Sequence, residues 1–231
     1  MAKSRDMQKQ RRADGSIRLE GQRPSLVIVG FLIIFSAIWN AVVWGLLVPE
    51  AIGAWKDGFG FWAIGATLFA SVFTLAGVAI IGLTLYVILS LFNPKVELTA
   101  NTDQVRPGEE LTLAWVLRGG RKMPEQLRIE FAGTERATYT RGTDTTTDSH
   151  DFLQSEIKST EDRHEIRSGS ARYTVPIALV PTLECPRNEI VYEIRFTGRL
   201  PRWPDLREQF VIRVLPRADI PAAASQEESA G

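Results

Sequence analysis

Four side chains that could bind a metal ion lie close together in one polar segment of the sequence. Carboxylate oxygens bind hard cations, but the spacing in this segment lacks the central glycine and terminal glutamate of a calcium-binding loop. His150 and His164 are too isolated for a zinc site, which needs three or four ligands. We therefore interpret the segment as a solvated hairpin loop and expect no metal. The segment is residues 141–151, RGTDTTTDSHD, and its candidate ligands are Asp144, Asp148, His150 and Asp151.

The sequence contains no arrangement that indicates nucleophilic catalysis. Such catalysis needs a serine or cysteine beside a base, usually on a recognisable turn. Cys185 is the single cysteine, so no intramolecular disulfide can form, and a lone thiol is typical of a reducing compartment. Gly119 and Gly120 indicate a turn rather than a phosphate-binding loop. We expect no catalytic residues and no cofactor.

The most distinctive candidate for a protein contact is residues 199–207, RLPRWPDLR. Trp203 lies between two prolines in this segment, and Arg199 and Arg202 precede it. A stiffened tryptophan flanked by arginine is typical of residues that anchor an interface. In the alternative interpretation, the indole folds back as a lid over the end of the domain. Trp203, Arg202 and Arg199 are the candidate interaction residues.

The elements that must carry these candidates begin with two long apolar runs, residues 25–48 and 60–92. Each run exceeds the roughly 18 residues that a helix needs to cross the hydrocarbon layer of a membrane. The first run is also longer than the apolar core of a cleaved signal peptide, which favours a retained anchor over cleavage near Gly53. We predict a transmembrane helical hairpin over residues 25–92, with an outer interfacial segment at about 49–63, where aromatic residues gather.

Basic residues ahead of the first run predict the direction of the hairpin. Residues 1–24 contain seven basic and three acidic side chains. Because Lys and Arg are retained on the cytoplasmic side, residues 1–24 are predicted to be a basic cytoplasmic tail, and two crossings return the chain to the same side. The predicted location is the bacterial inner (plasma) membrane, multi-pass, with cytoplasmic N- and C-termini. Membrane lipid is an expected partner, and nucleic acid is not.

Small residues recur along one side of each predicted helix. In lipid, small side chains favour close helix contact, so these residues predict helix packing within the hairpin. A homo-oligomer, or a docking face for another membrane subunit, is the alternative. The spans contain no Asp, Glu, Lys, Arg or His, so we do not expect a channel or pump from this hairpin alone. The helix-packing candidates are Gly30, Ala37, Ala41 and Gly45, and Ala63, Ala70, Thr74 and Gly77.

Residues 93–215 change to a period of two, which is typical of half-buried strands. Leu111, Leu113, Trp115 and Leu117, for example, alternate with Thr112, Ala114 and Val116. Several short strands separated by turn residues predict an antiparallel two-layer β-sandwich. Residues 216–231 lack apolar periodicity and are predicted to be a disordered tail.

Parts of this region resemble arrestin-like sandwich domains. The resemblance lies in the strand succession of residues 171–181, 190–196 and 210–214, and in the turn and strand of residues 105–113, VRPGEELTL. The whole chain is similar to uncharacterised bacterial inner-membrane proteins in which two helices precede such an arrestin-like (immunoglobulin-like) sandwich. The resemblance implies a binding or scaffold module rather than an enzyme.

These observations lead to one functional hypothesis and one alternative. The first is a membrane-anchored interaction or scaffold protein that presents its β-sandwich at the cytoplasmic face to an unidentified protein partner, without catalysis. Exposed strand edges of the sandwich could accept a partner strand. The alternative is a small subunit of a transport or envelope-assembly complex that docks through its transmembrane helices.

Overall fold

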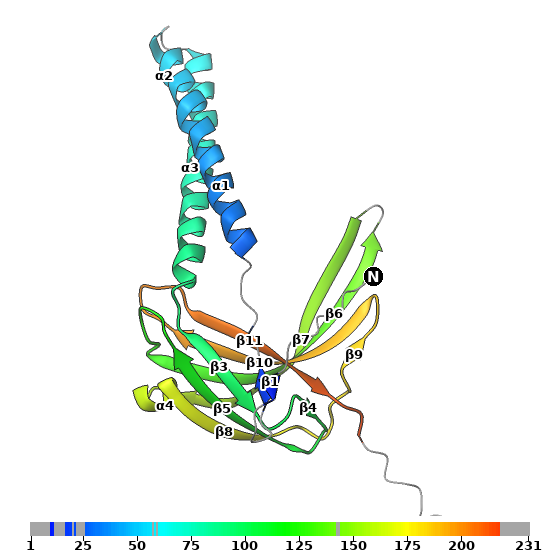
Figure 1. Cartoon of the computed structure of the whole chain (residues 1–231). Coiled ribbons are helices and arrows are strands. Elements are labelled where there is room, and N and C mark those ends of the chain that lie inside the picture. Colours follow the sequence, from blue (N-terminus) through cyan, green and yellow to red (C-terminus); the bar gives the residue numbers. More distant parts are fainter. Residues whose placement is uncertain are drawn as a thin grey trace, which may run out of the picture. The chain divides into compact units, whose positions relative to one another are not determined.

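The chain forms two compact units, which are described separately below (Figure 1). The helical unit comprises residues 23–93 and the short loop 201–205, and the sandwich unit comprises residues 1–22, 94–200 and 206–231. The structure is a computed structural model. It describes residues 10–11, 17–19, 21, 26–56, 58, 60–141 and 144–217.

Two long helices make up most of the helical unit. The first combines α1 (Leu26–Val42), a π-helical turn (Val43–Leu47) and α2 (Val48–Lys56), and the second is α3 (Phe61–Ser90). Both are long and apolar enough to cross a membrane. Residues 49–56, assigned from the sequence to the interfacial segment, instead continue the first helix, and α3 begins at Phe61, within the predicted interfacial segment of about 49–63.

The π-helical turn explains why Pro49 does not end the first helix. A proline inside a helix has no N–H to donate, and its ring collides with the carbonyl group four residues earlier. Here the N–H of Val48 donates to the carbonyl of Val43, which is five residues back, so the helix widens immediately before the proline. The helix therefore continues from α1 into α2 instead of stopping at Pro49, where the sequence analysis expected the first span to end.

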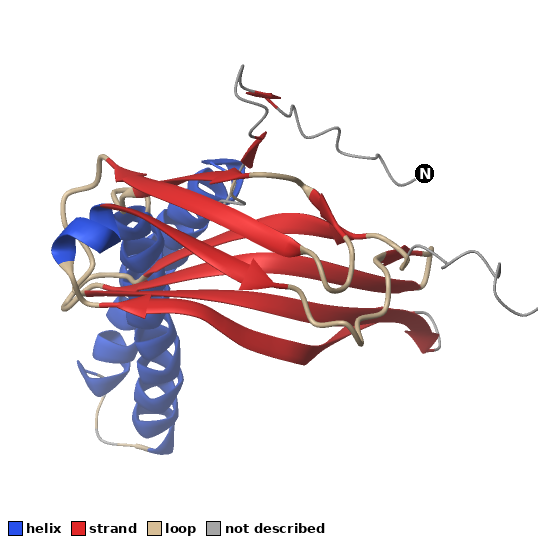
Figure 2. Cartoon of the chain, turned by 90° about the horizontal axis from the view of Figure 1, so that it is seen from below, coloured by secondary structure: helices blue, strands red, loops and turns tan. Residues whose placement is uncertain are grey.

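The sandwich unit is built from two mainly antiparallel sheets, seen in layers in Figure 2. The five-stranded sheet has the order β1-β2-β3-β5-β8. Its strands are β1 (Gln10–Arg11), β2 (Ile17–Leu19), β3 (Lys95–Ala100), β5 (Glu110–Arg118) and β8 (Ser168–Thr174).

The six-stranded sheet has the order β4-β11-β10-β6-β7, and β9 pairs with the outer end of β10. β4 joins β11 in parallel, whereas the other pairs are antiparallel. Its strands are β4 (Gln104–Val105), β6 (Gln126–Arg141), β7 (Asp144–Thr160), β9 (Leu183–Glu184), β10 (Asn188–Arg199) and β11 (Leu206–Val214). The short helix α4 (Arg163–Arg167) connects β7 to β8.

Large side chains from the inner faces of both sheets form the core. Trp115 on β5 lies edge-on to Phe196 on β10 with ring centroids 6.1 Å apart, and Phe131 on β6 contacts Tyr173 on β8 at 5.3 Å. The Trp115 indole N–H donates to the carbonyl of Glu165 at 3.0 Å, so the polar end of this buried side chain has a partner. The helices followed by a β-rich domain agree with the predicted architecture.

Two segments differ from the sequence-based assignment. Residues 144–151, interpreted as part of a hairpin loop, belong to β7 and pair with β6 up to Arg141. Residues 17–19, assigned to the basic tail, form β2 and bury Ile17 and Leu19 beside β3. Most of the predicted N-terminal tail, and residues 218–231 of the predicted C-terminal tail, lie outside the described residues.

Candidate interaction site

The four candidate metal ligands of the polar segment do not all lie on one face of β7. Successive strand residues point to opposite faces, so His150 and Asp151 on β7 diverge. Asp148 accepts a hydrogen bond from the Tyr139 hydroxyl at 2.9 Å, which raises the pKa of Tyr139. Among the described residues, no group of three or more His, Cys, Asp or Glu side chains could hold a metal ion.

Asp151 instead takes part in a charge network on the outer face of the six-stranded sheet, the face opposite the core. The Arg195 guanidinium donates to both carboxylate oxygens of Asp151, at 3.0 Å for Nη2 to Oδ1. Thr134 Oγ1 donates to the same Oδ1 at 2.6 Å and accepts from Arg195 Nη2 at 2.8 Å. Three strands thus meet through these side chains, because Thr134 lies on β6, Asp151 on β7 and Arg195 on β10.

The network extends to a buried carboxylate. Glu193 is only 1% exposed, and both Arg195 Nε and Arg136 Nη2 donate to it at 3.4 Å. Arg136 also pairs with Glu189 at 3.4 Å. The Arg195 and Thr134 hydrogen bonds hold the pKa of Asp151 well below its usual range, against the opposing effect of burial. The side chains satisfy one another, which indicates that the network fixes the three strands rather than binding a ligand.

Trp203, the predicted interface anchor, has its indole N–H occupied. The indole donates to Asn93 Oδ1 at 2.8 Å, and Asn93 Nδ2 donates to the carbonyls of Pro204 and Asp205 at 3.0 and 3.1 Å. These three hydrogen bonds connect Asn93, three residues beyond the end of α3, to the loop between β10 and β11. Trp203 is half-buried, whereas Arg199 and Arg202 are exposed. The interaction role of these three residues stays a prediction.

The packing candidates on α3 face the first helix. Ala63, Ala70 and Gly77 recur every seven residues and are buried, and Thr74 is half-buried. Gly77 is required for the close approach, because a Cβ atom there would lie 2.7 Å from Asn40 Oδ1. Asn40 Nδ2 donates to the carbonyl of Ser36 at 2.9 Å and reaches that of Gly77 at 3.4 Å. Asn40 therefore bonds to the partner helix.

The packing candidates on the first helix point elsewhere. Ala37, Ala41 and Gly45 are exposed and Gly30 is half-buried. A Cβ atom built at Gly30 or Gly45 would meet no other atom within 4 Å. The first helix instead turns a second row of residues toward α3, also spaced by seven, which comprises Val29, Ser36 and Val43.

A groove of about 450 Å³ lies between α2 and α3. Its hydroxyl groups are used internally: the Trp55 indole donates to Thr67 Oγ1 at 2.7 Å, and Thr67 and Thr74 donate to carbonyls one turn back. The groove therefore presents mainly carbon atoms to its surroundings. Its walls are Val48, Ala51, Ile52, Trp55, Thr67, Ala70, Ser71, Thr74 and Leu75.

A further surface, which the sequence analysis did not identify, lies where the six-stranded sheet continues past the five-stranded sheet. Tyr173, next to the last residue of β8, faces Phe131, but β6 continues for ten further residues to Arg141. Figure 1 shows the outer ends of β6, β7, β9 and β10 projecting from the two-layer part. The sequence signal was the apolar run of residues 175–180, which was read as part of a strand; β8 instead ends at Thr174, and Ile177 and Val180 beyond it are exposed.

Comparisons with known proteins give partial structural likeness. No protein-family model and no curated protein matches the sequence. The crystal structure of Spo0M, a sporulation control protein from Bacillus subtilis, is similar over 53% of this chain and 49% of Spo0M, with 15% sequence identity and a TM-score of 0.38. Squid arrestin is similar over 54% of this chain and 52% of its own, with 9% identity and a TM-score of 0.32. The chain thus spans about half the length of each.

Proposed function

We propose that the chain is a membrane-anchored interaction or scaffold protein of the bacterial inner membrane, without catalytic activity. The helical unit spans the membrane as a hairpin, and the sandwich unit is offered to a protein partner at the cytoplasmic face. The exposure of the helices supports the first part. In the most apolar 18-residue stretch of each helix, only 17% of the first and 11% of the second is buried. Most of the apolar side chains of the helices therefore need an apolar environment.

The observation that carries the proposal is the pairing of β2 with β3. β2 precedes the first helix and β3 follows the second, yet Ile17 lies opposite Ala100 and Leu19 opposite Leu98. Arg18 also forms a salt bridge with Glu97 on β3 at 2.8 Å. Two segments can pair only on the same side of a membrane, so this pairing supports two crossings that begin and end on one face.

The charge of residues 1–24 supports the cytoplasmic assignment of that face. Arg18 and Arg23 lie before the first helix in the sequence, whereas Lys56, the last residue of α2, is the single basic residue between Arg23 and Lys95. Because the excess of Lys and Arg sets orientation, the paired ends belong on the cytoplasmic side. The lone Cys185, which is exposed, is compatible with a reducing compartment.

A cross-linking experiment tests the same-side arrangement in membranes. Arg18→Cys and Thr99→Cys place thiols at directly paired positions in a Cys185→Ser background. We expect a short bis-maleimide to join them within one chain. The control pair, Arg18→Cys with Arg172→Cys, lies three strands apart in the same sheet and should not be joined. Equal cross-linking of the two pairs would contradict the β2–β3 pairing in the membrane.

A second experiment tests the interaction role. The full chain, carrying an affinity tag, should retain a protein partner when purified from membranes in a mild detergent. Retention should survive substitutions on the exposed side of α1 and be lost when residues 94–217 are removed. Recovery of a lone monomer with no partner would count against the interaction role.

The exposed small residues of the first helix favour one alternative, a subunit that docks through its helices. Ala41 and Gly45 are exposed, and their small size allows another helix to approach closely. In this case Ala41→Leu with Gly45→Leu should release the partner, and removal of the sandwich unit should not. Substitutions at Ala70 or Gly77 do not discriminate, because both residues are buried against the first helix.

A further inference from the structure

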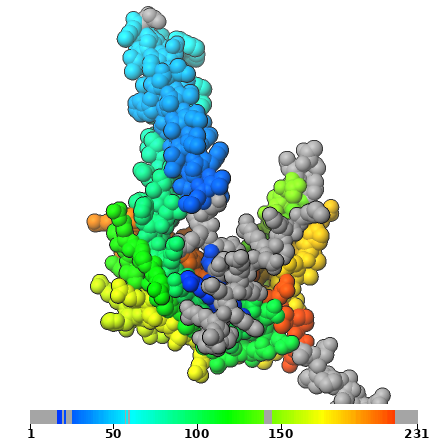
Figure 3. Space-filling view, in the orientation of Figure 1, coloured from blue at the N-terminus to red at the C-terminus, as the bar shows by residue number. Residues whose placement is uncertain are grey.

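Exposed apolar side chains of the sandwich unit gather at one end. Among the described residues from Pro94 onward, the large hydrophobic side chains with the greatest exposure come only from the projecting part of the six-stranded sheet and from the loop beside it. Phe152 is 39% exposed, Leu183 43% and Val180 53%. In Figure 3 the projecting ends of β6 and of the β9 region stand out from the rest of this unit. The full set is Tyr139, Phe152, Ile177, Val180 and Leu183.

Register places several of these side chains on the inner face of the sheet, as a continuation of the core. Gly133 on β6 lies opposite Tyr192, and a Cβ atom at Gly133 would be 2.7 Å from Phe152 Cζ, so the Phe152 ring lies over this glycine. The Phe152 ring is also edge-on to Tyr192, with centroids 5.8 Å apart. Leu183 is directly opposite Ile190, two residues from Tyr192, and therefore shares its face.

A bulge on β7 creates this arrangement. Gly133 pairs with Leu153 and Thr134 pairs with Asp151, so Phe152 is an extra residue with no partner on β6. Such bulges redirect side chains. On the other side, the Tyr192 hydroxyl donates to the carbonyl of Val180 at 2.7 Å and fixes the apolar loop beside the same face.

One buried polar atom at the foot of this surface has no hydrogen-bond partner among the described residues. Tyr173 Oη is buried, and none of the described groups forms a hydrogen bond with it. Its ring contacts Phe131, which lies one step along β6 from Gly133 on the same face. A buried hydroxyl without a partner is costly, so the site lacks a group that could bond to it.

The charged residues of this surface are mainly acidic. Glu135 and Asp148 follow Gly133 on the inner face, since Glu135 lies opposite His150 and Asp148 lies opposite Ala137. No ion pair of either carboxylate is found within the described residues. Between Gly133 and Tyr139, and on the part of β7 that faces them, His150 is the one basic residue that the register places on the inner face. An occupant with positive charge would therefore be favoured.

We propose that this surface, defined by Phe152, Leu183, Ile190, Glu135 and Asp148 and called the open face, binds an extended segment of a protein partner that alternates apolar and basic side chains. The five-stranded sheet ends before it covers this part of the six-stranded sheet. An extended segment would take its place there, with alternate side chains directed at the six-stranded sheet. The inference deepens the proposed function by assigning the partner's chemistry and its place on the sandwich.

Binding of defined peptides to the full chain in an uncharged detergent tests this inference. The probes are fluorescent eight-residue peptides that alternate Val with Lys, Val with Glu, and Ser with Lys. We expect the Val/Lys peptide to bind at least tenfold more tightly than either of the other two. Equal binding of the Val/Lys and Val/Glu peptides would indicate unspecific apolar adsorption and would overturn the proposal.

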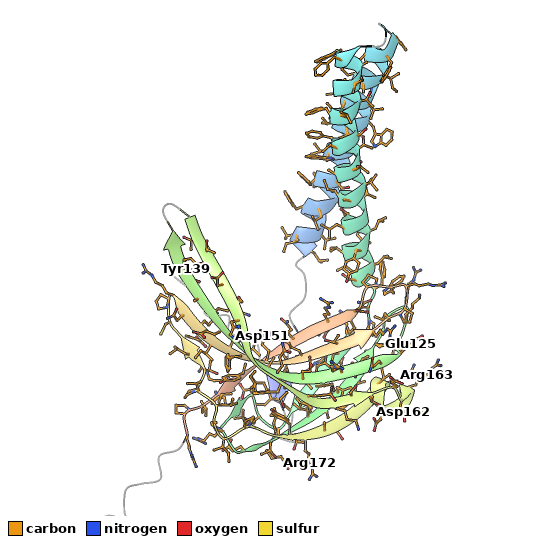
Figure 4. All side chains as sticks on the ribbon, turned by 180° about the vertical axis from the view of Figure 1, so that it is seen from behind. Glu125, Tyr139, Asp151, Asp162, Arg163 and Arg172 are labelled. Carbon is orange, nitrogen blue, oxygen red and sulfur yellow. The ribbon has the colours of Figure 1, made fainter. Side chains whose placement is uncertain are left out.

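Two variants and a matched control locate the site. Glu135→Lys with Asp148→Lys should weaken binding of the Val/Lys peptide at least tenfold, and Phe152→Ser at least fivefold. Glu125→Lys makes the same charge reversal at an exposed residue near the opposite end of β6, as Figure 4 shows, and should change binding less than twofold. Unchanged binding in the double variant would overturn the proposal even if Phe152→Ser did not fold.

Other occupants give different results. If the open face binds a second copy of the chain, sedimentation should show a concentration-dependent dimer that the double variant abolishes, and this would overturn the proposal. The proposed function fails separately, through the cross-linking of β2 to β3. If Arg18→Cys and Thr99→Cys are cross-linked but the Val/Lys peptide does not bind, the membrane arrangement is supported. The proposed binding role of the open face is then excluded.

Discussion

Arg195 is the residue whose removal most directly tests how the six-stranded sheet is held together. Arg195→Met removes the donors to Asp151, Thr134 and Glu193 while retaining an unbranched side chain. Glu193 would then keep Arg136, at 3.4 Å, as its one described cationic partner while remaining buried.

The magnitude follows from burial. Removing one partner of a buried ion pair lowers the free energy of unfolding by about 3–5 kcal/mol, whereas an exposed pair contributes about 0–1 kcal/mol. The side chains of Arg195 and Asp151 are intermediate, at 20% and 32% exposed, whereas that of Glu193 is buried. We therefore expect Arg195→Met to lower the free energy of unfolding of the sandwich unit by about 2–3 kcal/mol near neutral pH.

The stability lost in Arg195→Met should become smaller at low pH. The folded pKa of Asp151 lies below its ordinary value of 3.8, so its contribution to stability is present above that value and is lost as pH falls toward the folded pKa. The difference between the wild-type chain and Arg195→Met should be constant at neutral and mildly acidic pH. It should shrink once the pH is below about 4.

Denaturant unfolding of the full chain in detergent, followed by the β-sheet signal in circular dichroism, measures this effect. The control is Arg172→Met, because Arg172 is 77% exposed and its carboxylate partner Glu110 is 3.9 Å away. Arg172→Met should lower the free energy of unfolding by less than about 0.5 kcal/mol. Equal effects of the two substitutions, or a difference that persists unchanged at pH 3, would refute the assigned role of the network.

Three further predictions concern other parts of the chain. Asn93→Ala removes the hydrogen bonds that hold the 201–205 loop, so trypsin should cleave after the exposed Arg202 faster than in the wild-type chain; an unchanged rate would contradict the described contacts. Gly77→Leu should lower the thermal stability of the helices in detergent, because its side chain meets Asn40, whereas Gly82→Leu enters open space and should not; equal stabilities would count against this packing. Asp148→Asn should lower the pKa of Tyr139 toward 10.0, as measured by ultraviolet titration, because it removes the carboxylate that raises it; no change would exclude the hydrogen bond.

The main elements could be predicted because their sequence patterns are long and regular. Uninterrupted apolar runs indicated the two helices, and alternation such as that of residues 111–117 indicated the strands. The continuation of the first helix beyond Pro49 was missed, because the π-helical turn that accommodates proline has no sequence signature. β2 was missed because three residues within a charged segment give too little alternation.

The sites were harder to predict because they depend on register and on helix rotation. The first helix carries two rows of residues with similar spacing, and the sequence could not show that Val29, Ser36 and Val43, rather than Ala37 and Ala41, face α3. The pairing of Asp151 with Arg195 and the position of Phe152 both depend on one extra residue in β7. Patterns along one strand do not reveal which residue of its neighbour lies opposite.

The most direct test of the account is the side of the membrane on which each part of the chain lies. Cys185 is exposed and is the single cysteine, so a membrane-impermeant maleimide can report its accessibility in intact and permeabilised cells. The account predicts labelling of Cys185 only after permeabilisation. It also predicts labelling of Gly60→Cys, in a Cys185→Ser background, in intact cells, because Gly60 lies between the two helices. Labelling of Cys185 in intact cells, or protection of both positions, would contradict the hairpin that presents its sandwich to the cytoplasm.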